Sequence, residues 1–92
     1  MPEADLVLRT RMQVHRGVVE MVVWRVPQAV PPSQHNFKYR LVYLRDGVRL
    51  VGFDNERGKG DHQHKGSREV AYRFKDIETL LADFMAEVGR LE

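Results

Sequence analysis

The chain contains no cysteine among its 92 residues. Disulfide bridges, thiolate nucleophiles and cysteine-ligated zinc sites are therefore excluded together, which fits the reducing cytoplasm. No apolar run approaches the roughly 20 residues that a membrane-spanning helix needs, so we expect no membrane partner. The N-terminus, residues 1–5, is acidic and has no apolar segment typical of a secretory signal. The sequence predicts one cytoplasmic domain over residues 1–92.

Basic charge is concentrated in the first part of the chain. Residues 1–75 hold 14 of the 15 lysines and arginines but only 8 of the 13 acidic residues. Residues 76–92 carry the remaining basic residue, Arg90, beside five acidic ones. An anionic partner such as nucleic acid would be attracted to the first part. Basic sheet surfaces also occur in proteins that bind no nucleic acid, so charge alone leaves this partner open.

Alternation of polar and apolar residues predicts most of a β-sheet. The predicted strands are residues 5–14, 18–26, 37–45, 48–54 and 69–74. In the first strand, Leu6, Leu8, Met12 and Val14 share one parity, so we expect these four side chains on a single buried face.

The connections and the helix follow from local signals. Residues 15–17 end in a glycine that supplies a positive φ, and Asp46-Gly47 is a strong hairpin signal. Residues 27–36 contain three prolines and are predicted to form a crossing loop. Asp76 is expected to cap a helix over residues 77–91. Its apolar stripe comprises Ile77, Leu80, Leu81, Phe84, Val88 and Leu91.

These elements predict an α+β fold with a single antiparallel sheet of four to five strands and one C-terminal helix packed on one face. The other face is expected to carry Arg9, Arg11 and Arg25. It also carries either Lys38 and Arg40 or Tyr39 and Tyr43, according to a register that the pattern does not decide. We interpret Trp24 as core or edge packing rather than as a platform for nucleobases.

The densest group of reactive side chains is the run FDNERGKGDHQHKG, residues 53–66. A simple connection between two strands needs two to five residues. We therefore predict a functional loop over residues 54–67. His62 and His64 are two residues apart, so their imidazoles point the same way in extended backbone. Asp54 and Asp61 add carboxylates to the same segment.

Three interpretations of this segment remain open. In the first, His62 and His64 are general acid and base on an RNA phosphodiester, and Asp54 or Asp61 orients an imidazole. The phosphate would then be bound by Lys59, Lys65, Arg57 and Asn55. In the second, Asp54, Asp61, His62 and His64 bind a divalent metal that activates water. In the third, Asp54 and Asn55 tie a turn, Asp61 pairs with a lysine, and the histidines are solvated.

Several runs resemble the TumE-like family, small bacterial and archaeal proteins classed as toxins of toxin–antitoxin modules. They are KYRLVY (38–43), RDGVRLVGFDNERGKGDHQH (45–64), YRF (72–74) and LLADF (80–84). The resemblance covers about residues 18–90. Its signature positions here are Asp54, Asn55, Gly58, Lys59, Gly60, Asp61, His62 and His64. The resemblance implies a cytoplasmic protein with a cognate antitoxin as partner.

Many toxins of such modules cut RNA, and by that analogy we expect a type II toxin that is a ribonuclease. Acid/base chemistry without a metal cofactor is favoured, with RNA as the second partner. The alternative is a non-catalytic binding module. Such a module would engage the antitoxin, or the backbone of a nucleic acid, through the same basic loop.

Overall fold

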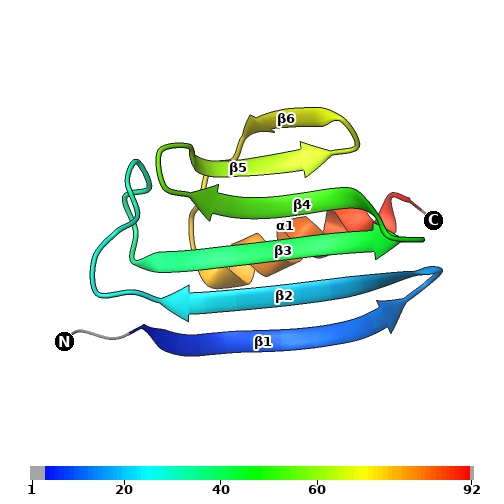
Figure 1. Ribbon diagram of the computed structural model, residues 1–92, viewed down its shortest axis with the longest axis horizontal. Helices are drawn as coiled ribbons and strands as arrows, with labels where there is room; N and C mark the ends of the chain where they lie inside the picture. Colours follow the sequence, from blue (N-terminus) through cyan, green and yellow to red (C-terminus); the bar gives the residue numbers. More distant parts are fainter. Residues whose placement is uncertain (1–3, 92) are drawn as a thin grey trace.

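The computed structural model describes residues 4–91 as one twisted antiparallel sheet with a single helix behind it, an α+β fold (Figure 1). The strands are β1 (Asp5–Val14), β2 (Gly17–Arg25), β3 (Phe37–Arg45), β4 (Val48–Glu56), β5 (Gly60–Lys65) and β6 (Arg68–Ala71). Each strand pairs with its neighbour in the chain, in the order β1-β2-β3-β4-β5-β6. Within residues 4–91, the structure has no helix whose length and apolar character would suffice to cross a bilayer.

The prediction of four to five strands is wrong, because the segment predicted as a functional loop over 54–67 is itself folded into the sheet. Gly58 and Gly60 have φ values of +87° and +78°, a left-handed backbone that glycine adopts at little cost. They close a turn at residues 57–59, so the chain reverses at once and residues 60–65 pair with β4. The strand predicted over residues 69–74 corresponds to β6, which ends at Ala71.

The helix α1 (Ile77–Gly89) lies behind the middle of the sheet (Figure 1). Asp76 caps it as predicted, since its carboxylate accepts a hydrogen bond from the Thr79 amide at 2.7 Å. The predicted stripe is buried at its centre but ends early: Leu91 follows the helix and is 38 % exposed. The buried side chains of the core are Val19, Met21, Val23, Tyr39, Leu41, Tyr43, Val51, Phe53, Leu80, Phe84 and Val88.

The strand register decides which side chains face away from the helix. Tyr39 and Tyr43 belong to the core, so Lys38 and Arg40 lie on the uncovered side. Arg25 was expected there too, but it pairs with Phe37 and shares the helix side with that ring. We call the uncovered side the open face. Its residues include Arg9, Arg11, Trp24, Lys38, Arg40, Arg49, Gly52, Asp54, His62 and His64.

Two details of the first hairpin differ from the prediction. The register shifts between Leu6 and Leu8, so Leu6 lies opposite Trp24 on the open face instead of beside Leu8. The positive φ of the turn belongs to His15 (56°), not to Gly17. Gly17 is needed for another reason: a Cβ atom there would lie 2.6 Å from the ring of a core tyrosine on β3.

Candidate active site

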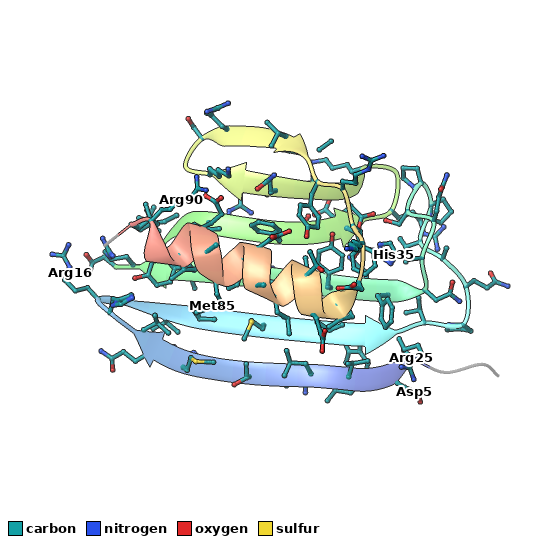
Figure 2. All side chains as sticks on the ribbon, turned by 180° about the vertical axis from the view of Figure 1, so that it is seen from behind. Asp5, Arg16, Arg25, His35, Met85 and Arg90 are labelled. Carbon is teal, nitrogen blue, oxygen red and sulfur yellow. The ribbon has the colours of Figure 1, made fainter. Side chains whose placement is uncertain are left out.

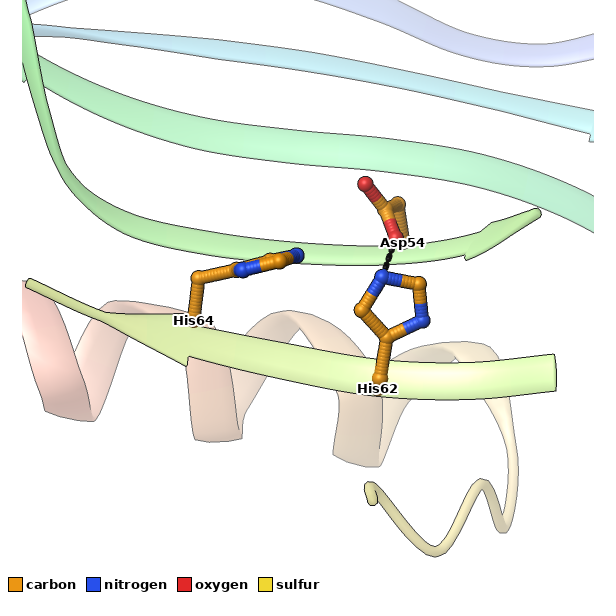
Figure 3. Close-up of side chains that lie close together, drawn as sticks. All are labelled: Asp54, His62 and His64. Carbon is orange, nitrogen blue, oxygen red and sulfur yellow. Dashed lines mark ion pairs between the residues drawn. The ribbon is translucent and has the colours of Figure 1, made fainter. Parts of the chain in front are cut away.

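The β4–β5 hairpin brings one carboxylate and two imidazoles together on the open face. Asp54 on β4 is the register partner of His62 on β5, and His64 follows two residues later on the same side. The two imidazole centroids are 4.8 Å apart, with ring planes inclined by 76°. Figure 3 shows the three side chains pointing toward one another from the two strands. The expectation that both histidines point the same way is confirmed.

His62 is held through both ring nitrogens. Its Nδ1 lies 2.9 Å from the Gly60 carbonyl oxygen, and because a carbonyl only accepts, Nδ1 carries a proton. Its Nε2 lies 2.6 Å from Oδ1 of Asp54. The contact has the length but not the alignment of a hydrogen bond. The His62 side chain is only 6 % exposed, so this contact lies in a nearly dry position.

His64 has the opposite electrostatic character. Burial, and then the charge of the Arg49 guanidinium, lower the pKa of its imidazole below the ordinary value of 6.5, and the Glu69 carboxylate only partly offsets them. Arg49 lies across Gly52, where a Cβ atom would be 3.0 Å from its Cδ. His64 is therefore mainly neutral near pH 7, while the neighbouring His62 lies directly against the Asp54 carboxylate.

Asp54, His62 and His64 are also of the residue types that bind metal ions. One ligand atom from each lies within 4.8 Å of the others. Two ligands bound tetrahedrally to one Zn²⁺ at about 2.0–2.1 Å lie about 3.3 Å apart. The 2.6 Å between Nε2 of His62 and Oδ1 of Asp54 is shorter than that, and Arg49 adds a competing positive charge nearby. The arrangement fits a direct contact between imidazole and carboxylate better than a coordinated cation.

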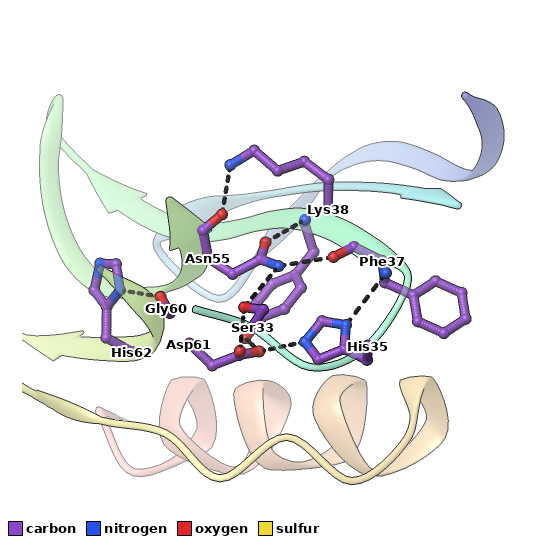
Figure 4. Close-up of polar contacts among 9 residues, drawn as sticks. Ser33, His35, Phe37, Lys38, Asn55, Gly60, Asp61 and His62 are labelled. Atoms are coloured by element: carbon purple, nitrogen blue, oxygen red, sulfur yellow. Dashed lines mark hydrogen bonds and ion pairs between the residues drawn. The ribbon is translucent and has the colours of Figure 1, made fainter. Parts of the chain in front are cut away.

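Asp61 does not join this group, contrary to the expectation of one site. It alternates with His62 and therefore faces the helix side, where Ser33, His35 and Tyr39 surround it (Figure 4). His35 Nε2 and the Tyr39 hydroxyl each lie 2.7 Å from Oδ2, and the Ser33 hydroxyl donates to Oδ1. Burial raises the pKa of Asp61, but these hydrogen bonds outweigh it and lower that pKa below 3.8.

This second group is a structural clamp rather than a nucleophile site. Ser33 donates to the carboxylate instead of to an imidazole, so nothing activates its oxygen. His35 stacks on Phe74 with ring centroids 3.7 Å apart. The backbone adds a further tie, because the Gly58 amide donates to the Pro31 carbonyl at 2.8 Å. The clamp fixes the loop over residues 27–36 onto the end of β4 and β5.

The predicted phosphate-binding residues are dispersed. Asn55 is fully buried, with its amide Oδ1 accepting from the Tyr39 backbone and its Nδ2 donating to the Phe37 carbonyl. Lys65 lies on the helix side, 3.3 Å from Glu87. The other two residues, Arg57 and Lys59, are in the exposed turn. Lys59 reaches Glu69 at 3.6 Å, and this carboxylate also lies 3.8 Å from His62 and 3.7 Å from His64.

Three residues of the site were missed by sequence reasoning. Arg49 reaches His64 because the β3–β4 register shifts between Tyr43 and Leu44, which no alternation pattern reveals. Glu69 is the register partner of His64, but only once residues 60–65 are known to be a strand. Arg40 is the partner of Asp54 and could be placed only after the register was known.

Comparison with protein families gives one clear finding. The chain matches the family model described as Toxin TumE over residues 1–92. No curated protein and no solved structure matches the chain significantly. The matched span includes every residue of the open face and of the clamp.

Proposed function

The chain belongs to the Toxin TumE family, and on this premise we propose that it is the toxin of a type II module and cleaves RNA by metal-independent acid/base catalysis. One observation carries the proposal. Two imidazoles 4.8 Å apart on an uncovered sheet face differ in their surroundings, since His62 lies 2.6 Å from the Asp54 carboxylate and the pKa of His64 is lowered by burial and by the Arg49 guanidinium. In the proposed mechanism His64 is the general base and His62, beside Asp54, is the general acid.

The chemistry is an intramolecular attack on the RNA backbone. His64 takes the proton of a ribose 2′-hydroxyl, and the 2′-oxygen forms a bond to phosphorus. The bond from phosphorus to the 5′-oxygen breaks, and His62, held beside Asp54, donates a proton to that leaving oxygen. The products are a 2′,3′-cyclic phosphate and a 5′-hydroxyl, with no net uptake of water or electrons in this step.

Of the residues expected to bind the phosphate, we retain Lys59, and Arg49 and Arg40 join it as sources of positive charge for the transition state. Arg49 lies beside His64, and Lys59 approaches the same imidazoles through Glu69. Arg40 occupies the register position opposite Asp54. Preorganised cations at these positions would stabilise negative charge developing on the phosphoryl oxygens. Asp61, Lys65 and Asn55 have no such role, because each is engaged on the helix side or in the core.

The family also supports a protein partner. A toxin of this kind is encoded with an antitoxin, and in the cytoplasm the antitoxin would hold the protein inactive until it is removed. An acidic antitoxin segment would compete with RNA for the basic open face. Neutralisation and substrate binding would then exclude one another.

The experiment is induction of the chain without its antitoxin in growing bacteria. His62→Ala and His64→Ala are each expected to relieve growth arrest while circular dichroism and accumulation match the parent. Gln63→Ala is the matched control, since Gln63 lies between the histidines but faces the helix side. If both histidine variants arrest growth as strongly as the parent, the imidazoles are not catalytic.

A metal-dependent form of the same reaction is the second candidate. The observation in its favour is that the Nδ1 of His62 donates to a backbone carbonyl, the outer contact common among metal-binding histidines, and leaves Nε2 toward Asp54. The residues that would hold the ion are Asp54, His62 and His64, and the ion would supply an activated water. Loss of cleavage in EDTA, with recovery on adding Mn²⁺ or Zn²⁺, would favour this form.

A further inference from the structure

A hollow of about 290 Å³ opens on the same face as the histidines, between β2 and β3. Its lining is formed by Val22, Trp24, Lys38, Tyr39 and Arg40. No acidic side chain is among these five residues, and the walls are mainly apolar. At this size it lies at the small end of ligand sites and suits one flat ring system.

The hollow is in line with the candidate active site. Val22 pairs with Arg40, Arg40 with Asp54, and Asp54 with His62, so one row of register partners crosses from β2 to β5 on the open face. Three strand spacings of about 4.8 Å place the ends of this row about 14 Å apart. A short single strand of RNA could therefore occupy both places at once.

Trp24 is the structural reason to assign the hollow to a base. The other aromatic side chains of the sheet, Tyr39, Tyr43 and Phe53 among them, are buried toward the helix. Among the phenylalanine, tyrosine and tryptophan side chains of residues 4–91, Trp24 alone lies on the open face, with the Arg9 guanidinium 5.6 Å from its ring centroid. An indole beside a cation is the combination on which unpaired bases stack in proteins that bind single strands.

Arg40 supplies the complementary charge. It lines the hollow, its side chain is exposed, and among residues 4–91 no carboxylate forms an ion pair with it. Lys38 reaches from the same wall toward β4, where its Nζ donates to the Asn55 carbonyl at 2.7 Å. A phosphate following the stacked base would meet Arg40 on its way to the histidines.

We propose that this hollow is a base-binding subsite for single-stranded RNA, in which Trp24 stacks on a nucleobase and Arg40 contacts the adjoining phosphate. The inference deepens the proposed function and rests on it for the identity of the polymer. A duplex would not fit, because its bases are already stacked and paired. Trp24 thus has a binding role beyond the packing expected from the sequence.

The test uses the fact that Trp24 is the only tryptophan of the chain. The full-length His64→Ala protein is titrated with a ten-nucleotide single-stranded RNA while tryptophan fluorescence is recorded. We expect strong quenching by RNA and none by inorganic polyphosphate of equal charge. With fluorescein-labelled RNA, Trp24→Leu is expected to bind at least about tenfold more weakly. Trp24→Phe should recover part of the loss, and the open-face control Arg11→Gln should bind nearly as the parent.

Each outcome separates the two proposals. Quenching by RNA that the parent protein never cleaves would retain the subsite and refute catalysis. Cleavage with unchanged Trp24 emission, or Trp24→Leu binding as tightly as the parent, would overturn the subsite alone. RNA that does not bind at all would overturn the subsite too and leave the hollow to a protein partner. Thermal unfolding of each variant establishes that the fold is retained.

Discussion

Two histidines only two residues apart have different surroundings, and the proposed mechanism gives them opposite roles for that reason. His62 is enclosed by an acceptor at each ring nitrogen, the Gly60 carbonyl and the Asp54 carboxylate. His64 is buried beside the Arg49 guanidinium, which disfavours a second positive charge. In the proposed mechanism, burial and neighbours, rather than residue type, thus distinguish the acid from the base.

At this scale the account predicts how His64 titrates. Its imidazole should titrate below pH 6.5 in NMR spectra of the EDTA-treated protein, and Arg49→Gln should move the midpoint upward because a lowering charge is removed. The control Arg11→Gln should not move it, since Arg11 pairs with Glu20 near the β1 edge. A His64 midpoint unaffected by Arg49→Gln would contradict the assigned cause.

The lowered pKa of His64 also determines how the free energy of unfolding changes with pH. Between the lowered folded pKa of His64 and its unfolded value of about 6.5, the unfolded chain binds more protons. The free energy of unfolding contributed by His64 therefore rises with pH through this window and is constant above it. Arg49→Gln should raise the folded pKa of His64 toward the unfolded value, so the free energy of unfolding should change less between pH 5 and pH 7.5 than in the parent. Denaturant titrations at these two pH values would measure the difference.

The elements were predicted well where a repeating pattern decides them. Alternation located β1 to β4 to within two residues at each end, and Asp76 marked the start of α1. Alternation failed at β5, because this strand contains no large apolar side chains that could alternate with the polar ones. The turn that precedes it depends on the positive φ values of Gly58 and Gly60, which alternation does not reveal. A strand composed of charged and imidazole side chains resembles a loop in sequence.

The sequence predicted the part of the candidate site that depends on strand alternation within one segment. The spacing of His62 and His64 fixed their common direction, and Asp54 was correctly placed with them. Asp61 was grouped with them because it is adjacent in sequence, but strand alternation sends it to the other face. The register shift that brings Arg49 to His64 depends on tertiary packing, so no local pattern could have shown it.

The clamp between the 27–36 loop and the sheet gives the prediction at the element scale. Asp61→Asn should lower the free energy of unfolding at pH 7 by about 1–3 kcal/mol, because the amide cannot accept from Ser33, His35 and Tyr39 together as a carboxylate does. Asp46→Asn, in an exposed turn, is the matched control and should change little.

The pH dependence identifies the cause. The folded pKa of Asp61 is lowered below 3.8, so its contribution is present above that pH and is lost as pH falls through the folded pKa. The difference between Asp61→Asn and the parent should therefore shrink in urea titrations at pH 3. An equal difference at pH 3 and pH 7 would show that the carboxylate charge is not what holds the loop.

At the scale of the whole molecule, the two faces of the sheet have separate tasks. The helix side holds the core and the clamp, and the open face gathers the histidines, the hollow and four cations, Arg9, Lys38, Arg40 and Arg49 (Figure 2 shows the helix side). In the part of the chain that the structure describes, no helix covers the open face (Figure 1). A flat basic surface of this kind suits an extended anionic chain.

Salt should therefore control RNA binding. The logarithm of the association constant of a single-stranded RNA should fall linearly with the logarithm of salt concentration, and Arg40→Gln should reduce the slope by about 0.7 for the one phosphate contact removed. Lys65→Gln is the control, since Lys65 lies on the helix side against Glu87. Anisotropy titrations from 50 to 300 mM, or about that range, would measure both slopes. Equal slopes for Arg40→Gln and the parent would place the RNA elsewhere.

The central claim is tested most directly by the cleavage products of a short single-stranded RNA incubated with purified protein in EDTA. The account predicts a 2′,3′-cyclic phosphate end, no cleavage of the matching DNA, and rates for His62→Ala and His64→Ala lower by about 10²- to 10⁴-fold. Gln63→Ala should cleave as the parent does. Intact RNA in a tight, salt-sensitive complex, or cleavage that survives loss of both imidazoles, would contradict acid/base catalysis by this pair.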